Sequence, residues 1–521
     1  MRNSSLVQRL RAPVFGALLA GAVLAVQPVH AAAPAGIDWQ PAASAAEVDR
    51  AFALARQSGR PVFLYWGAVW CPPCNQVKAT LFARPDFIER SRAFVPVYVD
   101  GDKPGAQKVA ARFKVTGYPT MILFRPDGAE ITRLPGEVDP ERYLLTLTAG
   151  LNAQTPVKEL LQRALARQAL SAEQWRLLAF YSWDTDAQQV LAAAELPGQL
   201  AALAAAVPAE LPQVRDRLAL KSLVASATAE PPAPGLPVEA GRQLLDRLLA
   251  QPESMRQLAD LLVGAAEPLV KHVAATPQAR AELAGRWDAA LARLAQQPGR
   301  SRPEQVDLLD ARVALWKLAA PAAPLAPAQR QEVLREVARL AAATTDKYER
   351  QAVIPNAAHV LASAGLLDES DELLKFELPH AVAPYYHMLG LAGNAKKRND
   401  AKAALDWYER AWRASQGPAT RIQWGTGFVN QLLELAPDDV PRVAGAAGAV
   451  VGQLGARSET FYERNQRSLQ RMAQRLAKWQ GSDPARAGAV ARIRRQLAVT
   501  CARLPQGDPG RANCESVFAK G

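Results

Sequence analysis

The sequence predicts an α/β domain over residues 38–151, followed by a large all-α region of helical hairpins over residues 152–521. Up to Leu151, short β-rich runs alternate with helical segments, which is typical of an α/β sheet. Beyond Leu151, apolar residues recur at three- and four-residue spacing, and Pro and Gly divide this pattern into helices of ordinary length. The composition agrees, because aromatic residues are only 7% of the chain and the helix-favouring Ala and Leu supply much of the apolar content.

The first half of the α/β domain is expected to begin with a helix. Ser44 and Glu47 form a capping-box pattern that opens this helix, which runs to about residue 57. The apolar run over residues 61–66 indicates a buried strand. A helix is predicted next over residues 72–82, with a shorter one around residues 86–88.

The second half of the domain is expected to end in a hairpin. The turn residues Pro126, Asp127 and Gly128 precede the last predicted strand, which adds antiparallel pairing to the sheet. The elements expected here are a strand at 95–100, a helix at 107–113, strands at 121–124 and 130–133, and a closing helix at 139–151.

The helical region carries two Pro-rich segments, at residues 231–236 and 320–327, which we interpret as subdomain breaks or as long interhelical loops. Residues 355–415 resemble two degenerate tetratricopeptide repeats. The residues that carry this resemblance are Ala392, Ala404, Tyr408 and Ala411, at the spacings where such repeats place small, small, aromatic and small side chains. The alternative is an Ala-rich helical hairpin that matches by chance.

The N-terminus predicts export. Residues 1–31 combine a basic start, an apolar run over residues 12–26 and small side chains at Val29 and Ala31, the pattern of a cleavable signal peptide. The alternative is a membrane anchor that is never cleaved. No later apolar run approaches the roughly 20 residues of a membrane span, so we expect no stable membrane insertion. The predicted location is the periplasm.

Composition excludes two classes of protein and leaves the charge to be explained. A chain that is 49% hydrophobic with 4 Cys in 521 residues is neither intrinsically disordered nor a small disulfide scaffold. A formal net charge of +12 favours nucleic-acid binding at first sight. Because an exported protein rarely meets nucleic acid, we expect no nucleic-acid partner. The charge is interpreted as solvated Arg on helices, the alternatives being affinity for anionic envelope surfaces or for acidic protein patches.

The residues that indicate chemistry are Cys71 and Cys74, in the run Trp-Cys-Pro-Pro-Cys after the first buried strand. Two Cys three residues apart on a first helical turn can close a small disulfide. Cys71 lies at the positive end of the helix dipole, which favours the thiolate, so it is the expected nucleophile. Cys74 is the expected resolving thiol. A metal site would need further ligands that lie nowhere near in sequence, so neither a metal nor a cofactor is predicted.

Residues 38–151 resemble the thioredoxin superfamily, closest in style to periplasmic thioredoxin-like domains. The resemblance includes Trp70 before the first Cys, Pro73 before the second, and a Tyr118-Pro119-Thr120 segment, in which Pro119 lies 48 residues after Cys71. It implies a cis Tyr118–Pro119 bond and a Pro119 that faces the disulfide. A substrate chain would lie beside this loop, hydrogen-bonded to the backbone of Tyr118. Trp70, Tyr118 and Pro119 are therefore the candidate substrate-binding residues.

Two departures from the thioredoxin pattern affect the expected chemistry. Tyr65 stands where many thioredoxins have a buried Asp that takes the proton of the resolving thiol. Pro72 stands where many relatives have Gly, and it removes a backbone N–H that could stabilise the Cys71 thiolate. No His lies between the two Cys. These features favour a reductase or isomerase over an oxidase.

The other two Cys, Cys501 and Cys514, are predicted to form a structural disulfide, worth about 3 kcal/mol for a loop of roughly 15 residues. The alternative is a second redox pair that exchanges electrons with Cys71 and Cys74.

The sequence thus predicts a periplasmic thiol–disulfide oxidoreductase whose partners are protein disulfides or dithiols and an upstream membrane or periplasmic redox protein. The alternative is a helical interaction or scaffold protein that uses its thioredoxin-like domain mainly as a binding module.

Overall fold

The computed structural model describes residues 36–134, 140–321 and 323–519. The predicted signal peptide, residues 1–31, lies outside these ranges. None of the helices in the described part of the chain has both the length and the apolar character needed to cross a membrane.

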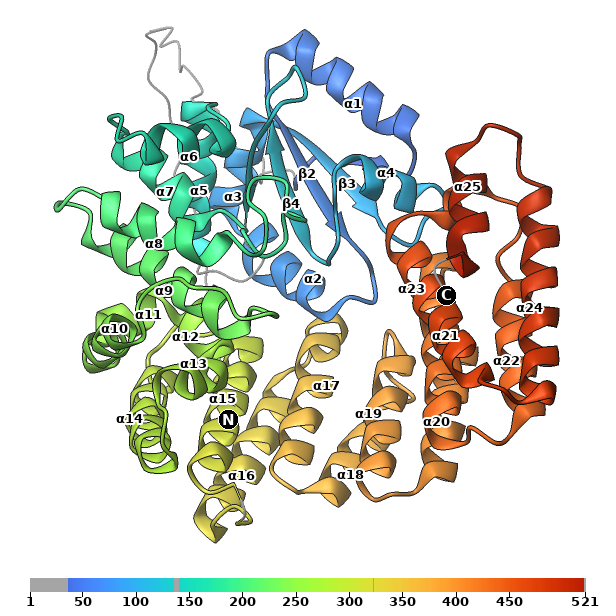
Figure 1. Cartoon of the computed structure of the whole chain (residues 1–521). Helices are drawn as coiled ribbons and strands as arrows, with labels where there is room; N and C mark the ends of the chain where they lie inside the picture. The colour runs from blue at the N-terminus through green and yellow to red at the C-terminus, as the bar shows by residue number, and fades with distance from the viewer. Residues whose placement is uncertain (1–35, 135–139, 322, 520–521) are drawn as a thin grey trace, which may run out of the picture. The chain divides into compact units, whose positions relative to one another are not determined.

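A five-stranded mixed sheet forms the centre of the N-terminal domain, with the strand order β1-β3-β2-β4-β5 (Figure 1). The strands are β1 (Gln40–Ala42), β2 (Val62–Gly67), β3 (Val95–Asp100), β4 (Thr120–Phe124) and β5 (Glu130–Leu134). Strand β3 runs parallel to β1 and β2, whereas β4 is antiparallel to both β2 and β5. The predicted strands and the predicted final hairpin are confirmed, and β1 is a short additional strand.

Helices cover both faces of this sheet. They are α1 (Ala45–Ser58), α2 (Pro72–Val77), α3 (Pro85–Arg90), α4 (Ala106–Arg112) and α5 (Pro140–Ala153), with a 3-10 turn at Ser91–Ala93. The predicted capping box is present, since the Ser44 hydroxyl accepts from the Glu47 N–H and the Glu47 carboxylate accepts from the Ser44 N–H. The predicted helix over residues 72–82 has the right extent, but its second half, Lys78–Phe82, is a π-helix.

Strand β2 is buried along its whole length because both of its faces are covered. Side chains alternate across a strand, so Val62, Leu64 and Trp66 pack with helices α1 and α4. Phe63 and Tyr65 point the other way and pack with α2, α3 and α5. The end of β2 therefore delivers the chain to the start of α2 from the middle of the sheet.

From residue 157 onward, the described chain is helical, as predicted. The helices are α6 (Val157–Leu165), α7 (Ala172–Phe180), α8 (Leu196–Ala206), α9 (Pro212–Thr228), α10 (Val238–Ala250), α11 (Pro252–Gln257), α12 (Ala259–Gly264), α13 (Ala266–Val273), α14 (Pro277–Ala295), α15 (Arg302–Ala319), α16 (Pro327–Ala343), α17 (Lys347–Ser363), α18 (Leu367–Glu377), α19 (Pro384–Lys397), α20 (Ala401–Ala414), α21 (Pro418–Leu435), α22 (Val440–Gly452), α23 (Glu463–Gln480), α24 (Pro484–Ala502) and α25 (Pro509–Glu515), with 3-10 turns at Ser458–Phe461 and Ser516–Phe518.

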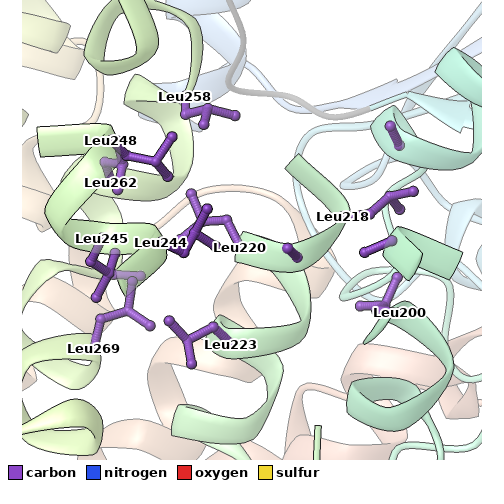
Figure 2. Packing of buried hydrophobic residues seen from close by; sticks show 14 of the residues in the cluster. Leu200, Leu218, Leu220, Leu223, Leu244, Leu245, Leu248, Leu258, Leu262 and Leu269 are labelled. Atoms are coloured by element: carbon purple, nitrogen blue, oxygen red, sulfur yellow. The ribbon is translucent and has the colours of Figure 1, made fainter. Parts of the chain in front are cut away.

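The first part of the helical region packs around a Leu-rich core (Figure 2). Leu218 and Leu223 of α9 and Leu245 and Leu248 of α10 belong to the same apolar cluster, although the Pro-rich segment 231–236 lies between these two helices. Further along the chain, α19 and α20 pack against each other across a short connection. The small residues Ala392, Ala404 and Ala411 are buried there and Tyr408 is half-buried. This hairpin is as predicted, and its tetratricopeptide character stays a prediction.

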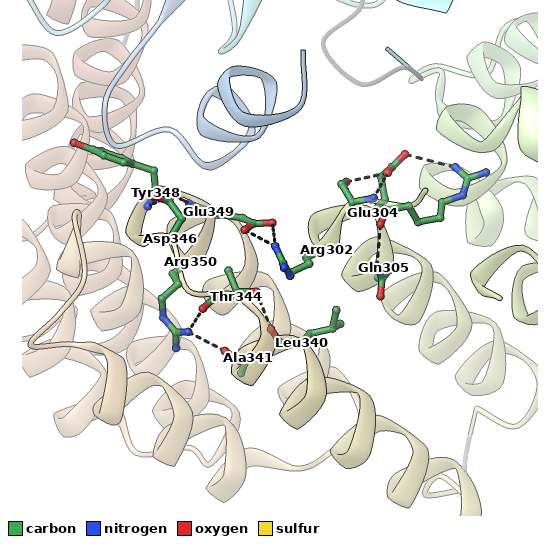
Figure 3. A network of polar contacts seen from close by, with 12 residues as sticks. Arg302, Glu304, Gln305, Leu340, Ala341, Thr344, Asp346, Tyr348, Glu349 and Arg350 are labelled. Carbon is green, nitrogen blue, oxygen red and sulfur yellow. Dashed lines mark hydrogen bonds and ion pairs between the residues drawn. The ribbon is translucent and has the colours of Figure 1, made fainter. Parts of the chain in front are cut away.

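A polar network holds helix α17 in place (Figure 3). Asp346 accepts hydrogen bonds from the N–H groups of Tyr348 and Glu349, both at 2.9 Å, and so caps the start of α17. Arg350 donates to the carbonyl oxygen of Ala341 at 2.8 Å and to that of Thr344, which satisfies the C-terminal end of α16. Arg302 of α15 forms an ion pair with Glu349 at 2.7 Å. The network matters for the site because α17 packs directly against α2.

Candidate active site

The Cys71–Cys74 pair lies at the start of α2 and is bonded as a disulfide, with the two Cα atoms 5.2 Å apart. Cys71 is the N-cap residue of the helix, with extended backbone angles. Its Sγ accepts a hydrogen bond from the N–H of Cys74 at 3.1 Å. The helix thus begins at the first Cys, so its positive end points at the sulfur expected to act as nucleophile.

Both residues between the two Cys are Pro, at positions N1 and N2 of the helix. Pro is tolerated there because these N–H groups have no partner within a helix. The consequence for chemistry is that the N–H of Cys74 is the first backbone donor that α2 offers to Cys71 Sγ. One N–H bond, together with the helix dipole, is what this turn provides to a Cys71 thiolate.

The Tyr118–Pro119 peptide bond is cis, as the resemblance to thioredoxins implied, and it leads directly into β4. The Tyr118 ring lies 5.1 Å from the Trp70 ring, centroid to centroid. The structure therefore brings together Trp70 and the loop that carries Tyr118 and Pro119, two segments that are far apart in the sequence.

Tyr65 occupies the position at which many thioredoxins have a buried Asp. Its hydroxyl points at the carbonyl oxygen of Cys74, 3.5 Å away, and its ring stacks on that of Tyr98 with centroids 5.3 Å apart. Burial raises the pKa of Tyr65 well above its ordinary value, so the hydroxyl stays protonated and cannot act as a base. Lys78 lies beside this cluster, with its Nζ 5.4 Å from the Tyr98 ring centroid, and burial lowers the pKa of Lys78.

Asp102 is a site residue that sequence reasoning missed. Its carboxylate accepts a hydrogen bond from the Trp70 indole N–H. It also accepts two hydrogen bonds from Thr420, one from the backbone N–H at 2.9 Å and one from the hydroxyl at 2.6 Å. Burial raises the pKa of Asp102, and the hydrogen bonds from Thr420 and Trp70 act in the opposite direction. The available signal was Trp70 itself, because a buried indole N–H needs an acceptor. Its partner Thr420 could not be found this way, because it lies in the helical region.

Two more residues of the helical region contact Trp70. The Tyr386 ring stacks on the Trp70 ring, with centroids 5.9 Å apart and 22° between planes. The Arg464 guanidinium lies 4.9 Å from the Trp70 centroid and 5.0 Å from the Tyr118 centroid. Tyr385 and Met388 of α19 also belong to the apolar cluster that contains the two Cys.

The disulfide itself is buried in this apolar cluster. Cys71 is 1% exposed and Cys74 is 0% exposed, and Trp70 is 8% exposed. Of the predicted substrate-binding residues, Trp70 is thus covered by Tyr386 of α19 and Arg464 of α23, whereas Tyr118, which Arg464 also contacts, and Pro119 are half-buried. Nothing in the sequence pattern of residues 38–151 indicates this cover.

The second pair, Cys501 in α24 and Cys514 in α25, is also bonded, with Cα atoms 5.6 Å apart. Both residues are buried in an apolar cluster of the C-terminal helices, which is a different cluster from the one around Cys71. Over the described residues, no group of three or more His, Cys, Asp or Glu is arranged to hold a metal ion.

Comparison with known proteins places the N-terminal domain. Residues 48–150 match the family model described as a thioredoxin-like domain. The chain is 32% identical over 148 residues to thiol:disulfide interchange protein DsbD 1 of Pseudomonas aeruginosa, a match that covers 27% of this chain and 23% of that protein. The chain thus spans about a quarter of the length of this relative.

Smaller relatives match over most of their length. The chain is 32% identical to a thioredoxin of Mycolicibacterium smegmatis over 94 residues, which cover 18% of this chain and 81% of that protein. A thioredoxin of Thermus thermophilus, solved in solution, is 31% identical, and the match covers 22% of this chain and 86% of that one with a TM-score of 0.20. Through this N-terminal domain, the chain belongs to the thioredoxin family.

Proposed function

We propose that this protein is a periplasmic thiol–disulfide oxidoreductase that acts on protein disulfides or dithiols. The observation that carries the proposal is the position of Cys71, which caps α2, is bonded to Cys74 and receives the first N–H of the helix. The cis Tyr118–Pro119 bond beside Trp70 adds the loop at which thioredoxins hold a substrate chain. The similarity to a protein named for thiol:disulfide interchange supports the same activity.

In the reducing direction, the Cys71 thiolate attacks one sulfur of a substrate disulfide. The substrate S–S bond breaks, a mixed disulfide forms with Cys71, and the other substrate sulfur leaves as a thiolate that takes up a proton. The Cys74 thiolate then attacks Cys71 Sγ, which releases the first substrate sulfur and forms the Cys71–Cys74 disulfide. The substrate has gained two electrons, and an upstream dithiol protein returns the pair to its reduced state.

A reductase or isomerase role is favoured over an oxidase role. Strong oxidants of this kind stabilise the nucleophilic thiolate strongly, which makes the reduced form the stable one. Here Pro72 and Pro73 offer no N–H, and no cationic side chain stands between the two Cys. The periplasmic location rests on the signal-peptide pattern of residues 1–31.

The test is a pair of variants in the full chain. Cys74→Ser leaves the mixed disulfide unresolved, so in the native envelope it should accumulate covalent complexes with protein partners. These complexes should separate when a reductant cleaves the mixed disulfide. Cys71→Ser should form none and should abolish reduction of a model protein disulfide. If Cys74→Ser captures no protein and Cys71→Ser keeps every activity of the wild type, the enzymatic proposal is lost.

A second function is favoured by one observation. Because Cys71 is 1% exposed, the thioredoxin-like domain also resembles a packed module within a helical scaffold. A scaffold role predicts that partners bind the Cys71→Ser variant as tightly as the wild type, which affinity capture without covalent trapping measures.

A further inference from the structure

The face of the thioredoxin-like domain that surrounds Cys71 is occupied by side chains from the same chain. We propose that Tyr386, Thr420 and Arg464, here called the cover residues, control access to the redox site. They hold the helical region over this face, and a thiol reaches Cys71 only when their contacts separate. The inference rests on the proposed function, because it assigns a control to the same disulfide.

The first argument is access. A thiolate must approach the sulfur that it attacks, so exchange requires an open path to Cys71 Sγ. Cys71 is 1% exposed, and its apolar cluster includes Ala383, Tyr385 and Met388 from the start of α19. In this arrangement Cys71 offers almost no surface to an incoming thiol. Exchange therefore requires that the cover move.

The second argument is that the Asp102 carboxylate forms hydrogen bonds with both the thioredoxin-like domain and the helical region. Asp102 accepts from the Trp70 indole on the thioredoxin-like side and from the N–H and hydroxyl of Thr420 on the helical side. Helix α21 has no side-chain cap of its own, because its N-cap is Gly417. Asp102 caps α21 instead, because its carboxylate accepts from the Thr420 N–H in the first turn. The helix dipole also favours a carboxylate at a helix N-terminus.

The backbone around Gly417 is built for this contact. Gly417 has a φ of +86°, and a Cβ added there would lie 2.8 Å from Asp102 Cγ. Any other residue would push the carboxylate away from the start of α21. The close approach between α21 and Asp102 thus depends on a position that only Gly fits without strain.

The third argument is the charge over the aromatic pair. Arg464 at the start of α23 lies over both Trp70 and Tyr118, and its Nη1 is buried without a hydrogen-bond partner. Tyr386 stacks on Trp70, and the centroid of the Trp424 ring lies 5.2 Å from that of the Tyr386 ring. A substrate that docks beside Trp70 and Tyr118 must displace these groups. Separation loses the cation–π contacts of Arg464 with both rings, so Arg464 helps to keep the cover closed.

The experiment measures access with a chemical probe. The oxidised full-length chain is treated with dithiothreitol under native conditions, quenched with a maleimide, and the reduction rate of each disulfide is read by peptide mass. In the double variant Thr420→Val/Arg464→Gln, dithiothreitol should reduce Cys71–Cys74 about 10-fold faster than in the wild type, since the cover loses a charge-assisted hydrogen bond and the cation over the Trp70 and Tyr118 rings. Tyr386→Leu should give a smaller increase.

The controls are matched to the variants. Thr228→Val and Arg475→Gln change the same residue types at exposed positions of α9 and α23, and both should leave the rate unchanged. Thr420→Ser keeps a hydroxyl and should restore the slow rate. The Cys501–Cys514 disulfide, buried in a separate cluster, reports within each molecule on general loosening of the fold.

The inference is overturned if the double variant reduces Cys71–Cys74 at the wild-type rate, or if both disulfides accelerate together. Its failure can be told from failure of the proposed function. If the variants accelerate reduction by dithiothreitol while Cys74→Ser captures no protein, the cover is real and the oxidoreductase proposal fails. If Cys74→Ser captures proteins while the rates stay equal, the function stands and the cover does not control it.

Discussion

The backbone N–H and the hydroxyl of Thr420 both donate to the carboxylate of Asp102, at 2.9 and 2.6 Å, across 318 residues of sequence. The same carboxylate accepts from the indole of Trp70, the residue before Cys71. The redox loop and the start of helix α21 therefore share one acceptor. A change at this carboxylate is expected to affect both the stability of the chain and the access to its disulfide.

Asp102→Asn should lower the free energy of unfolding by about 2 kcal/mol, because hydrogen bonds to a charged group such as this half-buried carboxylate are worth about 1.5–3 kcal/mol. The measurement is urea unfolding of the full chain. Asp49→Asn is the control, since Asp49 pairs with Arg112 at the surface and such pairs contribute about 0–1 kcal/mol. Equal effects of the two substitutions would contradict the role given to Asp102.

Two glycines of the same helical segment should respond to Ala in opposite directions. Gly417→Ala places a Cβ against Asp102 at a φ of +86°, so we expect a loss of about 1–3 kcal/mol in stability. Gly427 lies inside α21 with open space around its Cα, so Gly427→Ala should stabilise the chain by about 0.5–1 kcal/mol. Thermal unfolding of both variants checks the signs, and a stabilised Gly417→Ala would refute the close approach.

His387 should make stability depend on pH below neutrality. It is buried on α19 near Glu377 and Arg350, and burial lowers its pKa to about 4 from 6.5. The unfolded chain therefore binds a proton at His387 between pH 6.5 and 4, whereas the folded chain does not. The stability that the neutral His387 contributes is fully present above pH 6.5. As the pH falls toward 4, the free energy of unfolding drops by up to about 3 kcal/mol.

The control for this dependence is the variant His387→Gln, which cannot titrate. Between pH 6.5 and pH 4, the free energy of unfolding of the wild type should fall steadily relative to that of the variant. A difference that stays constant over this range would show that His387 is protonated in the folded chain.

The Cys501–Cys514 bond should stabilise the C-terminal helices and leave the redox site alone. The double variant Cys501→Ala/Cys514→Ala should lose about 3 kcal/mol of stability, as expected for a closed loop of roughly 15 residues. The reduction potential of Cys71–Cys74 should not change. A shifted potential or a slower regeneration of reduced Cys71 would instead support electron exchange between the two pairs.

The local parts of the fold could be predicted because short-range patterns specify them. The capping box at Ser44 opens α1, the turn at residues 126–128 precedes β5, and Cys71 caps α2. Each of these depends on residues within one or two turns of each other. The cis Tyr118–Pro119 bond was reached through resemblance to a family, since an X-Pro bond by itself favours trans.

The remaining features arise from packing between distant segments. The sequence by itself determined the thioredoxin-like domain, its Cys pair and the helical nature of the region after Leu151. Only the tertiary structure decided that Asp102 joins Trp70 to Thr420, that Arg464 lies over Trp70, and that Cys71 is buried. Amphipathic periodicity tells which face of a helix is apolar and does not tell which distant surface it covers, because many surfaces satisfy the same apolar face.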